Sequence, residues 1–312
     1  MEIINLENFD KDIFASGVGV ALGNFDGIHL GHMELVDLVV KKCNAKGIKS
    51  VLYTFHDHPE NVIAKKIVTP LINTNEMKAE ILSKVRLDYL LFEEFNQVLM
   101  NFSPEDFVKK ILIDKLNAKL VVIGFHYRFG HKGKGDAKLL KQFGKKYGFD
   151  VYVVEPVTYD NIIVSSSIIR DLVREGDVVL AAKFLNRPYE IWGTVIRGKN
   201  LGTKMGFPTI NIDPDERMVL PAKGVYISSV MFNDVSYQSI TNVGENPTVG
   251  DVGLRIETYI LNFSGDLYES NVKIKFMVRI RNERKFANLD ELISQITKDV
   301  DLAKEYWSST IY

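Results

Sequence analysis

The chain contains very little cysteine. Cys43 is the only one among 312 residues, which excludes an internal disulfide framework and favours a reducing, cytoplasmic location. An excess of charge of either sign is also missing, because 39 basic and 40 acidic residues leave a formal net charge of −1. A nucleic-acid partner is therefore not expected, since such proteins usually carry a broad basic surface.

Long hydrophobic runs are missing as well. No stretch of about 18 apolar residues occurs, so we expect no membrane-spanning helix and no membrane partner. The first five residues carry neither a basic segment nor a long apolar core, so no signal peptide is expected. What remains is an ordinary globular composition, 46% hydrophobic and 25% charged, and a length that favours two domains.

The first half of the chain alternates apolar runs with helical patterns. Continuous apolar strands separated by helices predict a Rossmann-like α/β domain with a parallel sheet covered on both faces. Ligands of such sheets bind at the carboxyl ends of the strands. Ser103 as N-cap and Pro104 at the first helical position mark the start of the third helix. The expected strands are 18–22, 50–55, 89–92, 120–123 and 151–154, and the expected helices are 34–46, 76–84, 105–116 and 138–147.

The pattern changes near residue 185. Short alternating segments separated by turn residues then dominate, which predicts an antiparallel sheet closing into a β-barrel. One amphipathic terminal helix follows, and Asn288 with Glu291 three residues later marks its start. We therefore expect one domain at 1–185 and a second at 186–312. The expected strands of the second domain are 191–196, 225–232, 238–243, 255–261 and 272–280.

The most informative motif lies where the first strand of the sheet is followed by a helix. It reads Gly23-Asn24-Phe25-Asp26-Gly27-Ile28-His29-Leu30-Gly31-His32. A glycine-rich turn at a helix N-terminus offers backbone N–H groups and the positive end of the helix dipole to phosphate. His29 and His32 fall on the same side of that turn and can donate hydrogen bonds to phosphate oxygens. The H-x-G-H pattern is typical of nucleotidyltransferases. A metal site is the main alternative, although Cys43 has no partner cysteine.

Three further segments of the first half follow strands. The loop that contains His58 follows the second strand, and Gly124-Phe125-His126-Tyr127-Arg128-Phe129-Gly130 follows the fourth, where its aromatic rings suit a planar ligand beside phosphates. A serine triplet at 165–167 starts a helix in which Arg170 can reach a leaving pyrophosphate. The structural alternatives are a polar loop, a solvated basic loop and a simple helix cap.

In the second half, spaced glycines precede two neutral oxygen donors. Glycines at 198, 202 and 206 let backbone amides approach phosphates. Thr209 and Asn211 can share a Mg²⁺ ion that keeps several waters. Glu257 can accept the proton of a substrate hydroxyl, as phosphoryl transfer requires, although a lone strand glutamate is more often simply exposed to solvent.

With these motifs the chain resembles the bacterial bifunctional riboflavin kinase/FMN adenylyltransferases over essentially its whole length. The first domain resembles the adenylyltransferase, with G-x-F-D-G-x-H-x-G-H at 23–32. The second resembles the kinase, with P-T-x-N at 208–211 and the family's catalytic-base glutamate at Glu257. The resemblance implies that the second domain phosphorylates riboflavin to FMN with ATP and Mg²⁺. The first domain then joins FMN to ATP, which gives FAD and pyrophosphate.

The resemblance also implies roles for individual residues. Catalysis falls to Glu257, His29, His32 and Arg170, and the metal ligands are Thr209 and Asn211. Riboflavin, FMN and ATP are the implied small-molecule partners, and FAD delivery to apo-flavoproteins follows as a further expectation. The residues assigned to flavin are His58, Tyr127, Phe129, Arg281 and Glu283. Those assigned to nucleotide are Gly23, Phe25, Asp26, Gly31, Ser165, Ser166, Ser167, Gly198, Gly202, Lys204, Gly206 and Thr209.

Some positions depart from the family pattern. Asp57 stands where the family usually has Pro, His126 stands for Asp, Tyr127 for Phe, Ser167 for Thr, and Thr203 for Arg. A monofunctional FAD synthetase with a weak or inactive kinase domain is therefore an alternative. A flavin- or nucleotide-binding regulator without turnover is a third hypothesis. The complete sets of expected catalytic residues argue against the regulator, because a pure binder needs no catalytic base.

Overall fold

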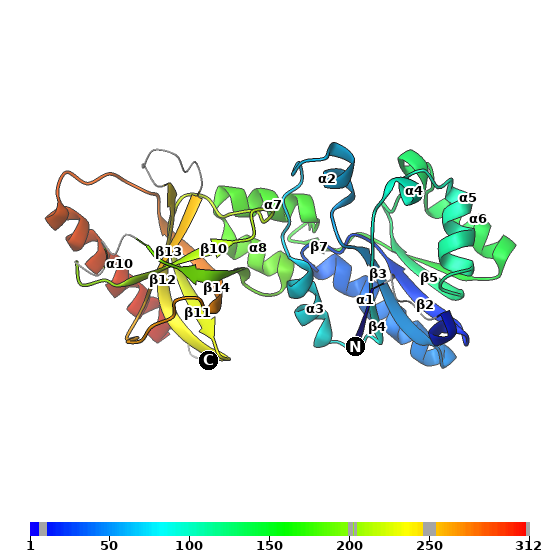
Figure 1. Cartoon of the computed structure of the whole chain (residues 1–312), viewed down its shortest axis with the longest axis horizontal. Helices are drawn as coiled ribbons and strands as arrows, with labels where there is room; N and C mark the ends of the chain where they lie inside the picture. Colours follow the sequence, from blue (N-terminus) through cyan, green and yellow to red (C-terminus); the bar gives the residue numbers. More distant parts are fainter. Residues whose placement is uncertain (6–10, 199–201, 203–204, 246–253, 310–312) are drawn as a thin grey trace. The chain divides into compact units, whose positions relative to one another are not determined.

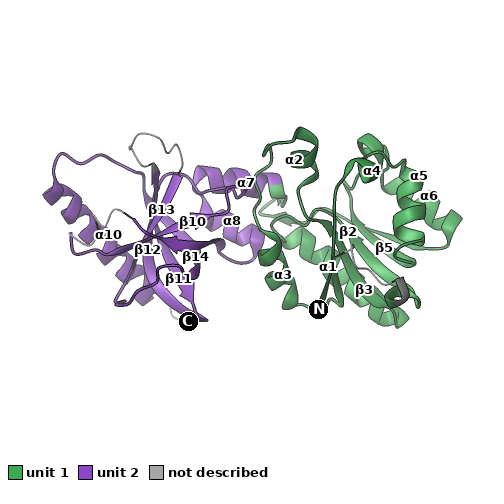
Figure 2. Cartoon of the chain, in the orientation of Figure 1, with its two compact units in different colours: residues 1–166 green, residues 167–312 purple. Residues whose placement is uncertain are grey.

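The computed structural model describes residues 1–5, 11–198, 202, 205–245 and 254–309, and it forms two compact units (Figure 1). Unit 1 is Met1–Ser166 and unit 2 is Ser167–Tyr312 (Figure 2). The change of sequence pattern lies farther along, near residue 185. The two positions differ because the helices α7 (Ser166–Glu175) and α8 (Val178–Leu185) make their contacts mainly with unit 2.

Unit 1 is built on a six-stranded sheet with the order β1-β4-β3-β2-β5-β6, in which every pairing is parallel. β2 is central, with β3 on one side and β5 on the other, so the strand order reverses between β2 and β5. Ligands of open parallel sheets bind at such a reversal, outside the carboxyl ends of the strands. The strands are β1 (Glu2–Asn5), β2 (Val18–Leu22), β3 (Lys49–Phe55), β4 (Tyr89–Glu93), β5 (Ala118–Gly124) and β6 (Asp150–Val154).

Helices cover both faces of this sheet, as the continuous apolar strands predict. Along β2, Val20 and Leu22 belong to one buried cluster, whereas Ala21 belongs to the other. The first cluster includes Phe107 and the second includes Val36. The helices of unit 1 are α1 (Leu30–Lys46), α2 (Pro59–Ala64), α3 (Asn75–Ser83), α4 (Gln97–Met100), α5 (Pro104–Asp106), the π-helix η3 (Phe107–Ile113) and α6 (Ala137–Tyr147), with short 3₁₀ turns η2 (Lys11–Phe14) and η4 (His131–Gly133).

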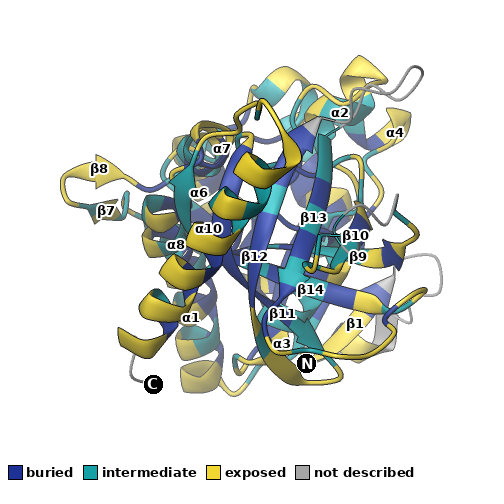
Figure 3. Ribbon diagram, turned by 90° about the vertical axis from the view of Figure 1, so that its left-hand side faces the viewer, coloured by how far each residue is buried: buried dark blue, intermediate teal, exposed yellow. Residues whose placement is uncertain are grey.

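The expected elements of the first half are confirmed, with some differences. Ser103 caps α5 as predicted, because its hydroxyl accepts a hydrogen bond from the Asp106 N–H at 3.0 Å. From Phe107 onward, however, the expected α-helix is a π-helix. The sequence analysis did not predict the strand β1 or the helices α2, α4 and α8. It also did not predict the exposed hairpin of β7 (Thr158–Tyr159) and β8 (Ile162–Ile163) (Figure 3).

Unit 2 contains a closed antiparallel barrel with the order β10-β13-β12-β11-β14-β9. Its hydroxyl side chains hydrogen-bond to one another in the buried interior, for example Thr241 to Thr258 at 2.8 Å. On the other face Ile240 and Tyr259 share a cluster with Trp307 of the terminal helix. The elements are β9 (Tyr189–Ile196), β10 (Thr209–Pro214), β11 (Gly224–Phe232), β12 (Val235–Glu245), β13 (Leu254–Ile260), β14 (Asn271–Arg281) and α10 (Leu289–Ser309).

The barrel and the terminal helix are therefore confirmed. Asn288 accepts a hydrogen bond from the Glu291 N–H at 2.9 Å, as expected at the start of α10. β10 was not among the expected strands. Its alternation of buried Ile212 with the polar residues on either side is a strand signal that the phosphate-motif interpretation of this segment obscured.

Candidate functional site

The turn after β2 places the H-x-G-H motif at the start of α1. His29 is the N-cap residue, and its Nδ1 accepts a hydrogen bond from the backbone N–H of His32 at 3.3 Å. The two imidazole rings stack with their centroids 3.7 Å apart and 17° between their planes. Since Nδ1 of His29 is the acceptor, the neutral ring carries its proton on Nε2, where it can be donated to a phosphate oxygen. The predicted pairing of the two histidines is present.

Backbone strain is concentrated in this turn. Phe25 and Ile28 adopt left-handed backbone conformations, with φ of 46° and 41°. They flank Asp26 and Gly27, and Gly27 has a φ of 91°. Such a conformation costs about 1–3 kcal/mol for a side chain of this size, and it persists only where the surroundings hold it. Both side chains are fully buried, which supplies that restraint. Strain of this kind is typical of functional sites.

Asp26 joins three segments around the turn. Its carboxylate accepts hydrogen bonds from the N–H groups of Ile72 at 3.0 Å and Asn73 at 3.1 Å. Its backbone carbonyl accepts a hydrogen bond from the Ser166 hydroxyl at 2.8 Å. The side chain is almost fully buried, so these contacts fix the turn against the loop before α3 and against the start of α7.

The glycines of the motif leave room for its rings. A Cβ on Gly23 would lie 3.1 Å from the ring of Phe25, and a Cβ on Gly31 would lie 3.2 Å from the ring of His29. The Phe25 ring in turn lies against His32, with the centroids 5.1 Å apart. Of the serine segment, Ser165 directly precedes α7, whereas Ser167 and Arg170 lie within the helix and Arg170 is buried.

The predicted flavin residues of unit 1 occupy two places. His58 is the residue before α2, and its Nε2 lies 3.5 Å from the side-chain nitrogen of Asn24. Asn24 is a site residue that the sequence analysis did not identify, although it lies inside the motif. The Tyr127 and Phe129 rings follow β5 and stack with their centroids 6.0 Å apart. Phe129 is buried in the core cluster of unit 1, and Tyr127 packs against that cluster. Burial raises the pKa of the Tyr127 phenol well above its usual value.

In unit 2 three polar residues form a row across three strands. Asn211 of β10 lies directly opposite Glu257 of β13, and Glu257 lies directly opposite Asn242 of β12. Directly paired residues share one face of a sheet, so the three side chains lie on the same side. Thr209 lies opposite Tyr259, which packs in the cluster beneath α10, so the row lies on the outer face of the barrel.

Two glycines allow the backbone of the preceding segment to lie close to Asn211 and Thr209. A Cβ on Gly198 would lie 2.2 Å from the Asn211 side-chain nitrogen, and a Cβ on Gly202 would lie 3.2 Å from the Thr209 hydroxyl. Gly206 adopts a left-handed conformation, with φ of 84°. Lys204, which is predicted to bind nucleotide, lies outside the described residues, as does Thr203.

The two predicted flavin residues of unit 2 differ in their surroundings. Arg281 forms a bidentate ion pair with Asp299 of α10, at 2.8 and 2.9 Å, and so holds the terminal helix to the barrel. Glu283 lies near the row, because its Oε1 is 2.6 Å from the position that a Cβ of Gly244 would occupy.

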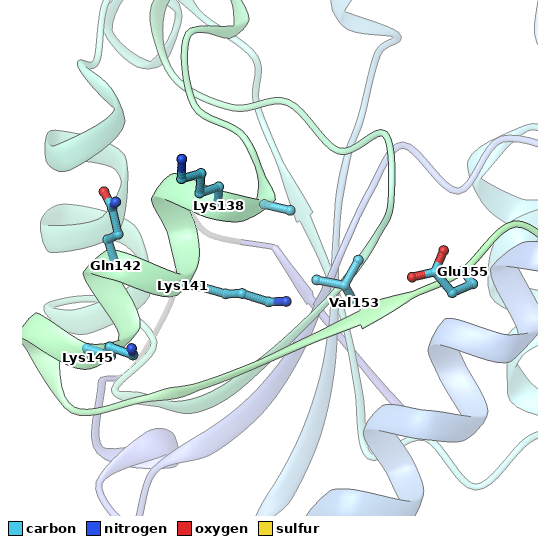
Figure 4. A pocket seen from close by; sticks show the side chains of 7 residues that line it. Lys138, Lys141, Gln142, Lys145, Val153 and Glu155 are labelled. Atoms are coloured by element: carbon cyan, nitrogen blue, oxygen red, sulfur yellow. The ribbon is translucent and has the colours of Figure 1, made fainter.

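The described residues contain no group of three or more His, Cys, Asp or Glu side chains that could hold a metal ion. Within the same ranges no helix is long and apolar enough to cross a membrane. A pocket lies between α6 and β6, where Lys141 points toward Val153 and Lys138 points away (Figure 4). It contains none of the predicted site residues.

Comparisons with known proteins identify the family of each half of the chain. The family model for FAD synthetase matches residues 12–168, and the model for riboflavin kinase matches residues 185–307. A bifunctional riboflavin kinase/FMN adenylyltransferase of Buchnera aphidicola subsp. Schizaphis graminum is 35% identical over 94% of this chain and 95% of its own length. Relatives with the same name from Bacillus subtilis and Escherichia coli K12 are 34% and 30% identical, over 93% and 94% of this chain and 92% and 94% of their own lengths.

A solved structure covers nearly the whole molecule. A crystal structure from Streptococcus pneumoniae described as a macrolide-efflux protein is 30% identical, with a TM-score of 0.85 over 97% of this chain and 99% of its own. That description belongs to the pneumococcal protein. A nucleotidyltransferase-type unit and a flavokinase-type barrel in one chain define a two-domain transferase. More particularly, the chain belongs to the bifunctional riboflavin kinase/FMN adenylyltransferase family, as the motifs predicted.

Proposed function

We infer that this chain makes FAD from riboflavin in two ATP-dependent steps, each performed by one domain. The position of Glu257 directly opposite Asn211, on the strand pair that also carries Thr209, supports this inference. Phosphorylation of a hydroxyl needs a base for its proton and oxygen ligands for the metal ion. We propose a functional boundary near residue 185, so that 186–312 is the kinase and 1–185 the adenylyltransferase. Because both steps consume ATP, we also propose that the protein acts in the cytoplasm.

In the kinase step, Glu257 accepts the proton of the terminal ribityl hydroxyl as its oxygen attacks the γ-phosphorus of ATP. The bond from that phosphorus to the β,γ-bridging oxygen breaks, and ADP leaves. Thr209 and Asn211 would supply oxygen ligands for Mg²⁺. The buried side-chain oxygen of Asn211 supports this assignment, because it has no hydrogen-bond partner among the described residues. Bound Mg²⁺ neutralises charge on the phosphates.

In the adenylyl step, no side-chain nucleophile is required. An FMN phosphate oxygen attacks the α-phosphorus of ATP, and the bond to the bridging oxygen of the departing pyrophosphate breaks. We assign stabilisation of the developing charge to His29, His32 and Arg170, with the N-terminus of α1 contributing its backbone N–H groups. We place the flavin ring near Tyr127, Phe129 and His58. Delivery of FAD to apo-flavoproteins follows from this product.

The test is a chromatographic assay of the purified protein with riboflavin, ATP and Mg²⁺, and with FMN in a parallel reaction. We expect FMN and then FAD from riboflavin. Glu257→Gln should abolish riboflavin phosphorylation and spare FMN adenylylation. FAD from FMN but no product from riboflavin would instead identify a monofunctional FAD synthetase. Flavin binding without any product would favour the regulator.

A further inference from the structure

Asn242 lies next to the proposed base but outside the residues to which a role has been assigned. It is directly opposite Glu257 on the neighbouring strand, and Asn211 is opposite Glu257 on the other side. Paired residues of antiparallel strands have Cβ atoms about 4.5–5.5 Å apart on one face of the sheet. A side-chain amide therefore flanks Glu257 on both sides.

Among the described residues, the side-chain amide of Asn242 has no hydrogen-bond partner, and the residue is half-buried. Its chain neighbour Thr241 faces the other way and closes the buried hydroxyl network with Ser228 and Thr258. Because the barrel does not use the Asn242 amide, that amide is available to a ligand on the outer face.

The missing side chain of Gly244 lets the Glu283 carboxylate approach this amide. A Cβ at Gly244 would lie 3.2 Å from Nδ2 of Asn242 and 2.6 Å from Oε1 of Glu283. The amide and the Glu283 carboxylate therefore approach the same point, which a larger residue at 244 would fill. Side chains that can donate or accept hydrogen bonds thus lie in sequence from Glu257 past Asn242 to Glu283.

We propose that Asn242 is a specificity-determining residue that hydrogen-bonds a secondary hydroxyl of the ribityl chain. This inference rests on the riboflavin kinase function proposed above. Neighbouring strands lie about 4.8 Å apart, so the polar groups recur at a spacing that an extended polyol can follow. An amide offers both a donor and an acceptor, which suits a hydroxyl that is also both. Asn242 thereby directs the terminal hydroxyl to Glu257.

The test compares riboflavin with flavins that each lack one secondary ribityl hydroxyl, using kcat/KM of the full chain. Asn242→Ala should lower kcat/KM for riboflavin about tenfold, which is the size of one hydrogen bond to a hydroxyl. For the one analogue that lacks the contacted hydroxyl, kcat/KM should not change. The discrimination between riboflavin and that analogue should therefore disappear in the variant.

Gln238→Ala is the matched control, because Gln238 is an exposed amide on the same face of β12, four residues away. It should leave the ratio of kcat/KM for riboflavin to kcat/KM for each analogue unchanged. Equal losses for riboflavin and all the analogues would overturn the inference, since a purely structural effect lowers all substrates alike. If Asn242→Ala fails to fold by circular dichroism, Asn242→Ser provides the same comparison. A wild-type protein that phosphorylates no flavin would refute the proposed function instead.

Discussion

Nδ1 of His29 accepts the backbone N–H of His32 while the two imidazole rings stack 3.7 Å apart. One ring nitrogen of His29 caps α1, and the other is the donor to which we assign charge stabilisation in the proposed adenylyl step. The cap also determines the tautomer of the neutral ring. Structure and chemistry at this position can be separated by choosing a residue that caps a helix but carries no imidazole.

The first prediction uses that separation. His29→Asn should keep the cap, since Asn is a favoured N-cap residue, whereas His29→Ala should lose about 1 kcal/mol of stability as well. Both variants should lose FAD formation from FMN and keep FMN formation from riboflavin. Thermal unfolding and the two product assays check this. FAD formation at the wild-type rate in His29→Asn would remove the imidazole from the mechanism.

Asp26 gives a second prediction. Its carboxylate accepts two backbone N–H groups, of Ile72 and Asn73, in a buried setting. Asp26→Ala leaves both donors without that acceptor, so we expect a loss of about 1–3 kcal/mol in unfolding free energy, measured in urea. FMN adenylylation should fall because the strained turn is no longer held. Riboflavin phosphorylation should persist. Its loss would show that the effect of Asp26→Ala is not confined to unit 1.

The sequence predicted those structural features that depend only on residues a few positions apart. The apolar runs of unit 1, the Ser103 and Asn288 caps and the H-x-G-H turn each depend on periodicity or capping within a few positions. Contacts between distant residues were not predictable in this way. The bond between Asp26 and Ile72, 46 residues apart, and the opposition of Asn242 to Glu257 depend on strand register and loop packing.

Two misassignments have specific physical causes. The π-helix at Phe107–Ile113 has the same apolar side chains as an α-helix, and periodicity over so short a segment does not distinguish them. The segment that forms β10 contains Thr209 and Asn211, and its alternation is short enough for a loop beside phosphate to have the same residue types. In both places tertiary packing sets the geometry that these residues adopt.

Glu105 gives a prediction for pH. Hydrogen bonds and ion pairs with Lys146, with the Tyr147 hydroxyl and with Lys109 lower the pKa of its carboxyl to about 2. Its pKa in the unfolded chain is about 4.3. A depressed folded-state pKa contributes stability above the unfolded value, and that stability is lost as the pH falls from about 4.3 toward 2. Glu105→Gln should therefore be less stable than the wild type at pH 7 and differ less at pH 3.

The measurement is the urea midpoint of both proteins at the two pH values. High salt serves as the control, because the Glu105 side chain is 39% exposed and salt screens its ion pairs. A stability difference that does not depend on pH would show that Glu105 acts through something other than its charge.

The close packing of Gly19 against the Cys43 sulfur leads to a prediction about stability. A Cβ on Gly19 would lie 2.2 Å from the Cys43 sulfur and 2.8 Å from the Leu120 side chain, so Gly19→Ala overpacks the core. We expect a loss of about 1–3 kcal/mol in unfolding free energy, part of which Cys43→Ala restores in the double variant.

Burial raises the pKa of the Cys43 thiol to about 11, so the folded protein should resist alkylation at pH 8. Rapid alkylation before unfolding would contradict this placement.

The last prediction concerns Gly198, where a Cβ would lie 2.2 Å from the side-chain nitrogen of Asn211. Gly198→Ala should displace that amide from the row that faces Glu257, and a displacement of about 1 Å at a reacting centre can cost 100-fold in rate. We expect riboflavin phosphorylation to fall by up to that factor. FMN adenylylation should stay at the wild-type level, which shows that unit 1 remains intact. If the loss arises through Asn211, adding Gly198→Ala to an Asn211→Ala protein should have no further effect. Losses that instead multiply would mean that Gly198 acts independently of Asn211, for instance by admitting a phosphate group close to the backbone.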